Sequence, residues 1–267
     1  MNTDARVRLH TGRSMPVLGL GTWQLNDDTA GTVDEALRQG SRMIDTSGDY
    51  GTQPGVGEAM RRTDLDRDQI YLVTKVEEDE DAYEATRRNL DELGLEQADL
   101  MLIHRPPPSG AGEDLWRGLI RARDEGLARD IGVSNYSVEQ IEELVRATGE
   151  TPAVNQVEWS PFDWSRDLLD WSTERGIVIQ AYSPLTRGKR LGDERLVALA
   201  ERHGRTPAQV LIRWNLQLGV VPLPKANRRD HAVENLAVFD FELTDADIDE
   251  LDCLNRHASS LGSLPYV

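Results

Sequence analysis

The chain has 267 residues, of which 39% are hydrophobic and 6% aromatic, and this size and composition are typical of one large globular domain. Its formal net charge of −17 argues against nucleic acid and anionic membranes as partners. A single cysteine excludes an internal disulfide, and no apolar run is long enough to span a bilayer or to form a signal peptide. We expect one cytoplasmic domain over residues 1–267, with no metal-ligand cluster, as a monomer rather than an oligomer.

The predicted elements begin with an N-terminal β-hairpin formed by residues 6–10 and 15–18. Short apolar strands and amphipathic helices then alternate along the chain. The predicted strands are residues 17–21, 42–46, 70–76, 99–104, 131–134, 153–159, 177–182 and 220–224. The predicted helices are residues 32–39, 56–62, 81–93, 113–125, 138–146, 167–175, 193–203, 207–218 and 229–237, with an extra one at 245–255.

This order of elements predicts an α/β fold, the (β/α)8 TIM barrel, with an N-terminal hairpin and an extra C-terminal helix. Eight strand–helix units in about 250 residues are the usual size of that barrel. The strands are nearly continuous apolar runs, as expected when both faces of a parallel sheet are buried. A doubly wound open sheet is the structural alternative, but the segment from Gly19 to Gln24 lacks the third glycine of its phosphate-binding turn.

Polar or aromatic residues stand at the carboxyl end of each predicted strand, where barrels carry their active sites. They are Trp23, Asp45, Lys75, His104, Ser134, Asn135, Gln156, Tyr182 and Lys225. Lys75 would be buried within its strand, which is unfavourable unless it is paired, and Asp45 is the natural partner. Taken alone, residues 40–57 also fit an aspartate that caps a helix and a tyrosine, Tyr50, that lies on a loop. His104 alone also fits a hydrogen-bonded core histidine. The set of strand ends favours a catalytic site.

The chemistry of such a cluster is proton donation to an oxygen atom. A phenol with a pKa of about 10 is a weak acid at neutral pH, and a neighbouring ammonium lowers that pKa. Asp45 would keep Lys75 charged inside a low-dielectric pocket. Tyr50 could then give its proton to a substrate oxygen while His104 donates a hydrogen bond to the same oxygen. A site of this kind still needs a source of electrons.

Seven segments, in order and over nearly the whole chain, resemble the aldo-keto reductases. They read IDTSGDYG, LVTK, LIHRP, GVSNYS, NQVEWSPF, AYSPLTRGK and LPKANRRDHAVENLAVFDFEL. The resemblance implies a catalytic tetrad of Asp45, Tyr50, Lys75 and His104. It also implies that Ser134, Asn135 and Gln156 hold the carboxamide of the nicotinamide. Tyr182 would stack on the nicotinamide ring.

The resemblance further implies NADPH as the cofactor, extended across the rim, with NADH as an alternative. The remaining cofactor-binding residues that it implies are Gly21, Thr22, Ser183, Pro184, Leu185, Lys225, Ala226, Asn227, His231, Glu234 and Asn235. Two positions near the ribose phosphate depart from the family: a serine and an arginine are replaced by Ala226 and His231, with Arg228 and Arg229 between them. The tryptophan that usually follows the catalytic histidine is Arg105, which would share the substrate pocket with Trp23.

We therefore expect an oxidoreductase that transfers a hydride between NADPH and a small aldehyde or ketone, with Tyr50 as the general acid. One alternative is a cofactor-binding regulatory or scaffold subunit with little catalysis, which a degraded tetrad would have supported. Another is a phosphate-handling barrel without redox chemistry, which would give no role to the set of Ser134, Asn135, Gln156 and Tyr182.

The charge composition allows two explanations. Only three of the 30 basic residues are lysines, Lys75, Lys189 and Lys225, and the acidic residues number 47. Arginine in place of lysine together with an acidic excess fits a halophilic protein from a salt-rich cytoplasm. A GC-rich genome would give the same arginine bias, so both explanations stay open.

Overall fold

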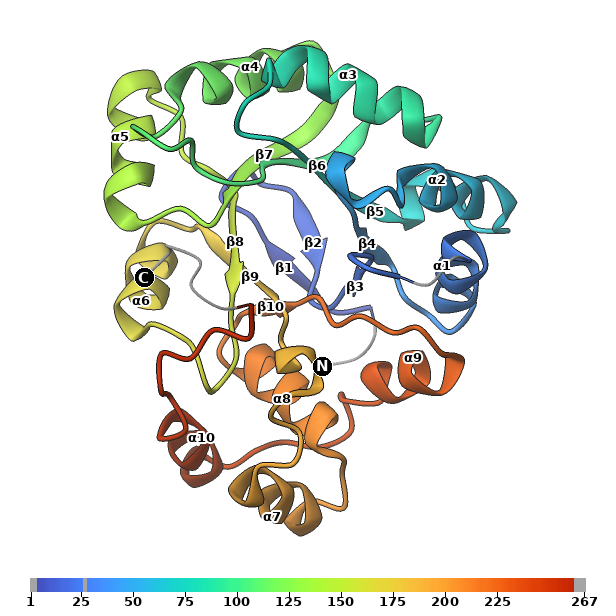
Figure 1. Cartoon of the computed structure of the whole chain (residues 1–267), viewed down its shortest axis with the longest axis vertical. Coiled ribbons are helices and arrows are strands. Elements are labelled where there is room, and N and C mark those ends of the chain that lie inside the picture. Colours follow the sequence, from blue (N-terminus) through green and yellow to red (C-terminus); the bar gives the residue numbers. More distant parts are fainter. Residues whose placement is uncertain (1–3, 26–27, 262–267) are drawn as a thin grey trace.

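The computed structural model describes residues 4–25 and 28–261, and its centre is a ring of parallel strands (Figure 1). In chain order the strands are β3 (Leu20–Gly21), β4 (Met43–Asp45), β5 (Tyr71–Val76), β6 (Ala98–Ile103), β7 (Ala128–Ser134), β8 (Val154–Glu158), β9 (Val178–Tyr182) and β10 (Val221–Pro222). Each strand pairs with the next one. The ring closes where the amides of Gly19 and Gly21 donate to the carbonyls of Pro222 and Pro224, at 3.1 and 3.2 Å. The predicted barrel is confirmed.

Helices surround the ring on its outside (Figure 1). They are α1 (Thr29–Arg38), α2 (Gln53–Arg62), α3 (Ala82–Leu93), α4 (Glu113–Asp124), α5 (Val138–Thr148), α6 (Arg166–Glu174), α7 (Glu194–Arg202), α8 (Pro207–Gln217), α9 (Arg229–Leu236) and α10 (Asp245–Asp252). Their apolar sides pack on the outer faces of the strands, as Trp116 and Leu119 of α4 do against Met101 of β6. The predicted extra helix at the C-terminal end is α10. Among the described residues, no helix has both the length and the apolar character needed to cross a membrane.

Two helices begin three residues earlier than predicted, because single residues and not apolar spacing determine their first turns: a capping aspartate in α1 and a proline in α2. The carboxylate of Asp28 accepts a hydrogen bond from the amide of Gly31 at 2.8 Å and so fixes the start of α1 at Thr29. Pro54 lies in the first turn of α2, where its missing N–H leaves no bond unmade.

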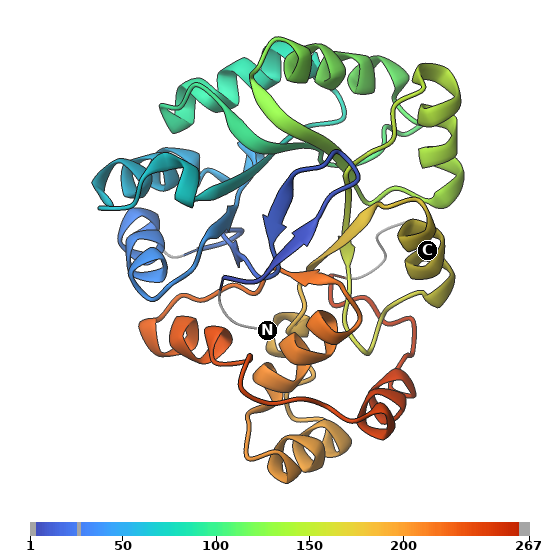
Figure 2. The same ribbon diagram turned by 180° about the vertical axis from the view of Figure 1, so that it is seen from behind.

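The hairpin consists of β1 (Arg6–Arg8) and β2 (Ser14–Pro16), which lie across the amino end of the barrel (Figure 2). Leu9 and Met15 are buried there against the inward side chains of Met43 and Val73. The first barrel strand is shorter than predicted because the amide of Val17 still bonds within the hairpin region, to the carbonyl of Ala5 at 3.2 Å. The amino end of the barrel is thus filled with apolar side chains.

Candidate active site

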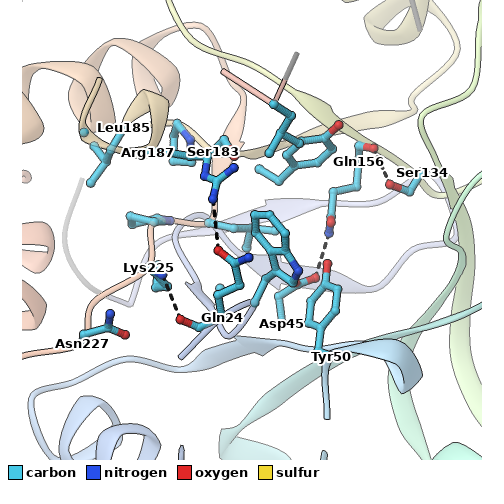
Figure 3. Close-up of a pocket in the computed structure, with 18 of the residues that line it drawn as sticks. Gln24, Asp45, Tyr50, Ser134, Gln156, Ser183, Leu185, Arg187, Lys225 and Asn227 are labelled. Carbon is cyan, nitrogen blue, oxygen red and sulfur yellow. Dashed lines mark hydrogen bonds between the residues drawn. The ribbon is translucent and has the colours of Figure 1, made fainter. Parts of the chain in front are cut away.

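A cavity of about 640 Å³ lies at the carboxyl end of the strands, and this volume is ordinary for a site that binds a small molecule or cofactor (Figure 3). Most residues that were predicted from the sequence line it. They are Gly21, Trp23, Asp45, Tyr50, His104, Arg105, Ser134, Asn135, Gln156, Tyr182, Ser183, Pro184, Leu185, Lys225, Asn227 and His231.

A buried ion pair between Lys75 and Asp45 lies at the cavity, and Asp45 forms part of the cavity wall. The side chain of Lys75, near the end of β5, is fully buried, and its Nζ lies 2.9 Å from each carboxylate oxygen of Asp45. Lys75 Nζ also donates to the carbonyl of Thr46 at 2.8 Å. Gln156 Nε2 donates to Asp45 Oδ2 at 2.8 Å (Figure 3). Because both charges are paired and hydrogen-bonded, the ammonium can exist in the interior, and the predicted Lys75–Asp45 pair is present.

Tyr50 lies next to this ion pair. It ends a short 3₁₀ turn, Gly48–Tyr50, and Gly51 follows in a left-handed conformation with φ of 66° that leads the chain into α2. Lys75 Nζ is 4.9 Å from the centre of the Tyr50 ring, within range of a cation–π contact.

The pKa of Tyr50 differs from the sequence-based prediction. Burial raises that pKa well above its ordinary value, and the carboxylates of Asp45, Asp49 and Glu77 raise it further. The predicted lowering of this pKa by Lys75 is wrong, because burial disfavours a phenolate and Asp45 balances the ammonium charge. Tyr50 therefore keeps its proton at neutral pH, as a proton donor must.

His104 follows β6 and is buried beside Tyr50, with the two ring centres 5.6 Å apart at an angle of 71°. Its Nδ1 lies 2.8 and 2.9 Å from the two carboxylate oxygens of Glu77 and 3.6 Å from Asp49. Burial, with a further contribution from Lys75, lowers the pKa of His104 to about 3. The imidazole ring is therefore neutral at neutral pH. Arg105 lies 3.4 Å from Asp49 and 3.6 Å from Glu77.

The residues expected at the nicotinamide bind one another across four strand ends. Ser134 Oγ donates to the carbonyl of Gln156 at 2.7 Å. Asn135 adopts a left-handed conformation, with φ of 65°, and its Nδ2 donates to the carbonyl of His104 at 3.0 Å. Its Oδ1 accepts from the hydroxyl of Tyr182 at 2.9 Å. These bonds fix the positions of the side chains on the cavity wall.

Basic side chains gather at the other end of the cavity, where Lys225, Arg187, Arg228 and His231 line it. Gln24 joins two of them, since its carbonyl accepts from Lys225 Nζ at 3.0 Å and its Oε1 from Arg187 at 3.1 Å (Figure 3). Burial and then the charge of Arg187 lower the pKa of Lys225. Two neighbouring positive charges such as Lys225 and Arg187 repel each other, and a bound anion would reduce this repulsion. This end of the cavity therefore suits an anionic ligand.

Comparison with known proteins agrees with this geometry. The sequence pattern of the Aldo/keto reductase family matches residues 17–256. The chain belongs to this family. It is 41% identical over 265 residues to an aldo-keto reductase of Mycobacterium sp. (strain JLS), covering 97% of this chain and 96% of that one. It is 38% identical over 256 residues to the glyoxal reductase of Bacillus subtilis (strain 168), covering 94% and 92%.

Solved structures of aldo-keto reductases have the same fold. One from Brucella melitensis is 36% identical with a TM-score of 0.90, and the match covers 95% of this chain and 99% of that one. One from Bombyx mori, in complex with NADP, is 29% identical with a TM-score of 0.90 and coverage of 96% and 94%.

Four of the cofactor residues expected for an aldo-keto reductase lie outside the cavity wall. Thr22 is buried with its hydroxyl 3.0 Å from that of Thr52, and Ala226 packs in the core. On α9, Glu234 accepts a hydrogen bond from the hydroxyl of Thr206. Asn235, also on α9, is buried but does not line the cavity. Their cofactor roles stay predictions.

Sequence reasoning also missed several residues of the candidate site. The cavity wall includes Gln24, Arg187, Gly188, Leu191, Leu223, Pro224 and Leu261, which were not predicted as site residues. It also includes Arg228, which the sequence had indicated only as one of two arginines near the ribose phosphate. Leu261 reaches the wall because Glu158 accepts from the amide of Ser260 at 2.6 Å. Glu77 was missed although it lies two positions after Lys75. Side chains two apart on a strand point to the same side, and that spacing could have found it.

Proposed function

We propose that the protein is an NADPH-dependent carbonyl reductase that acts on small aldehydes or ketones, with Tyr50 as the general acid. The observation that carries this proposal is the placement of a protonated Tyr50 in the cavity, between the buried Lys75–Asp45 pair and His104. A proton donor, a fixed cation and an imidazole around one space are the groups needed to receive charge on a carbonyl oxygen.

The cofactor fits the cavity by its chemistry. Its phosphates would bind at the cationic end, to Lys225 and Arg187, and its carboxamide among Ser134, Asn135 and Gln156. When bound, NADPH supplies the hydride that reduces the carbonyl carbon. The NADP in the Bombyx mori structure supports this choice, as does the repulsion between Arg187 and Lys225, which adds to burial in lowering the pKa of Lys225. NADH remains the alternative, because Ala226 and His231 replace the residues expected near the ribose phosphate.

The residues of this chain then have separate roles in reduction. Tyr50 gives its proton to the carbonyl oxygen, and the Lys75 ammonium stabilises the phenolate that is left. His104 orients the same oxygen through a hydrogen bond. Trp23, 37% exposed at the cavity, provides an apolar wall for the substrate's carbon chain. The glyoxal reductase among the relatives supports small aldehydes as substrates.

The test is the change Tyr50→Phe, which removes the donated proton and leaves the proposed cofactor contacts in place. We expect a loss of turnover on the order of 10²- to 10⁴-fold with unchanged NADPH affinity, measured by cofactor oxidation at saturating substrate and by calorimetry. Tyr71→Phe is the matched control: Tyr71 is also buried, and its hydroxyl has no partner within the described residues.

Two outcomes would contradict the proposal. If Tyr50→Phe kept most of the wild-type turnover with chemistry rate-limiting, Tyr50 would not be the proton donor. If the wild-type protein bound NADPH but reduced no member of an aldehyde and ketone panel, a regulatory or scaffold role would replace the catalytic one.

A further inference from the structure

We propose that Glu77 is a positioning residue for His104: its carboxyl group determines whether Nε2 of the imidazole meets the substrate as a hydrogen-bond donor or as an acceptor. This inference rests on the proposed carbonyl reduction, since a carbonyl oxygen can only be stabilised by a donor. Neither the resemblance to the family nor the strand-end pattern pointed to Glu77.

The contact geometry commits Nδ1 of His104 to Glu77. Both carboxylate oxygens lie within hydrogen-bond distance of Nδ1, at 2.8 and 2.9 Å. The hydroxyl of Ser47, itself fully buried, donates to Glu77 Oε1 at 3.0 Å and so holds the carboxyl group in place. With Nδ1 engaged on this side, Nε2 is the ring nitrogen left to serve the cavity that His104 lines.

Counting protons on the pair gives two states. If Glu77 is ionised and His104 neutral, the single ring proton lies on Nδ1 and points at the carboxylate, and Nε2 is a bare acceptor. If the pair holds one more proton, Nε2 carries a hydrogen in either arrangement of the other proton, and it becomes a donor. One proton therefore converts the imidazole from a group that repels a carbonyl oxygen to one that binds it.

Burial decides where the additional proton lies. It raises the pKa of Glu77 above its ordinary value of 4.5 and lowers the pKa of His104 to about 3. Both directions favour a neutral pair in which the Glu77 carboxyl donates to Nδ1 over a pair of opposite charges. As the pH rises through the raised pKa of Glu77, the pair loses this proton and Nε2 stops being a donor.

Charged groups from three neighbouring elements face the pair, and they set the pH at which this happens. Glu77 Oε2 lies 3.6 Å from Arg105, whose charge lowers the pKa of Glu77, while Asp79 raises it. The full set comprises Asp45 at the end of β4, Asp49 and Tyr50 from the segment after it, Lys75, Glu78, Asp79 and Glu80 from β5 and its loop, and Arg105 after β6.

The first test reads the tautomer directly and needs no catalysis. In protein with ¹⁵N-labelled histidine, the two ring nitrogens of His104 are followed by NMR across the pH range, with His104→Gln identifying its signals among the five histidines. We expect the Nδ1–H form at pH 8 in the wild type and a larger share of the Nε2–H form in Glu77→Gln, which removes the negative charge. An Nε2–H form in the wild type at pH 8, or identical signals in Glu77→Gln, would overturn the inference.

The second test is the pH profile of turnover. We expect wild-type kcat for carbonyl reduction to fall about tenfold per pH unit above the pKa of the pair, and this limb to disappear in Glu77→Gln but to persist in Glu77→Asp. Glu78→Gln is the matched control: it removes the same charge from the next residue, which contacts Arg105 at 3.7 Å. An unchanged limb in Glu77→Gln, or its loss in Glu78→Gln, would contradict the proposal.

The two tests separate this inference from the proposed function. A protein that reduces no carbonyl compound would refute the reductase proposal, while the NMR result would still decide whether Glu77 sets the tautomer of His104. If Glu77→Gln fails to fold, as a thermal melt would show, the wild-type tautomer at pH 8 decides alone.

Discussion

The buried pair of Lys75 and Asp45 allows one prediction to be worked through in energetic terms. The side chain of Lys75 is 0% exposed and that of Asp45 5%, so solvent screens neither charge. Lys75→Met removes the ammonium and leaves the carboxylate buried, with Gln156 Nε2 at 2.8 Å as a remaining donor. Removing one partner of a buried ion pair destabilises a protein by about 3–5 kcal/mol, because the other charge stays buried and uncompensated.

A destabilisation of this size is easily measured. For a large domain, 1 kcal/mol corresponds to about 2–4 °C in Tm, so we expect a decrease of about 6–20 °C for Lys75→Met. Calorimetric unfolding and urea titration measure it. Lys189→Met is the matched control. Lys189 is exposed, and within residues 4–25 and 28–261 its Nζ bonds only a carbonyl, that of Ser260, so its loss should change stability by less than about 1 kcal/mol.

A double-mutant cycle tests the reasoning itself. Asp45→Asn combined with Lys75→Met leaves no charge unpaired, so the double variant should be more stable than the sum of the two single losses predicts. If Lys75→Met changed the unfolding free energy by less than about 1 kcal/mol, or if the two losses simply added, the charge of Asp45 would not be what holds Lys75.

Three further predictions follow from the cofactor end, the surface and the helix packing. Lys225→Ala should weaken NADPH binding much more than NADH binding in calorimetry, because charge-assisted contacts to phosphate are strong; equal losses would place Lys225 at the shared pyrophosphate or at nothing specific. Tm and activity should both rise between about 0.1 and 1 M KCl, because the screening length falls from about 10 to 3 Å and the surplus carboxylates, 47 acids against 30 bases, repel one another less. A flat or falling Tm would refute a halophilic character. Gly57→Ala should lower Tm strongly, because the added Cβ would lie 2.0 Å from the carbonyl oxygen of Leu93, and an unchanged Tm would show that α2 and α3 can separate without loss.

The barrel could be predicted from the sequence because its signal is local. Each strand is buried on both faces, so it reads as a continuous apolar run, and the helices between show an apolar stripe. The boundaries that were wrong depend on single side chains: Asp28 as a cap, Pro54 in a first turn. The first barrel strand was predicted too long because Val17 serves the hairpin, which apolar periodicity does not reveal.

The site residues at strand ends could be predicted from the sequence, and those that loops bring to the cavity could not. Asp45 and Lys75 lie at the ends of neighbouring strands and His104 directly follows the next one, so their proximity follows from parallel pairing. Arg187 comes to the cavity on a turn in which its own φ is 54°, a conformation that no periodicity in the sequence marks. The raised pKa of Tyr50 was missed for another reason: burial, which outweighs the nearby cation, is a property of the whole fold.

The junction where β3 meets β10, called the seam below, has a consequence for local opening of the barrel. Pro222 and Pro224 have no N–H, so the seam's hydrogen bonds run in one direction only, from the amides of Gly19 and Gly21. Both strands are only two residues long. We expect these two amides to exchange with deuterium faster than those of β5 or β6, and to slow when a ligand bridges Gly21 and Lys225, which line the same cavity. The seam, where the strand ring opens most readily, would then be the part of the barrel that cofactor binding stabilises.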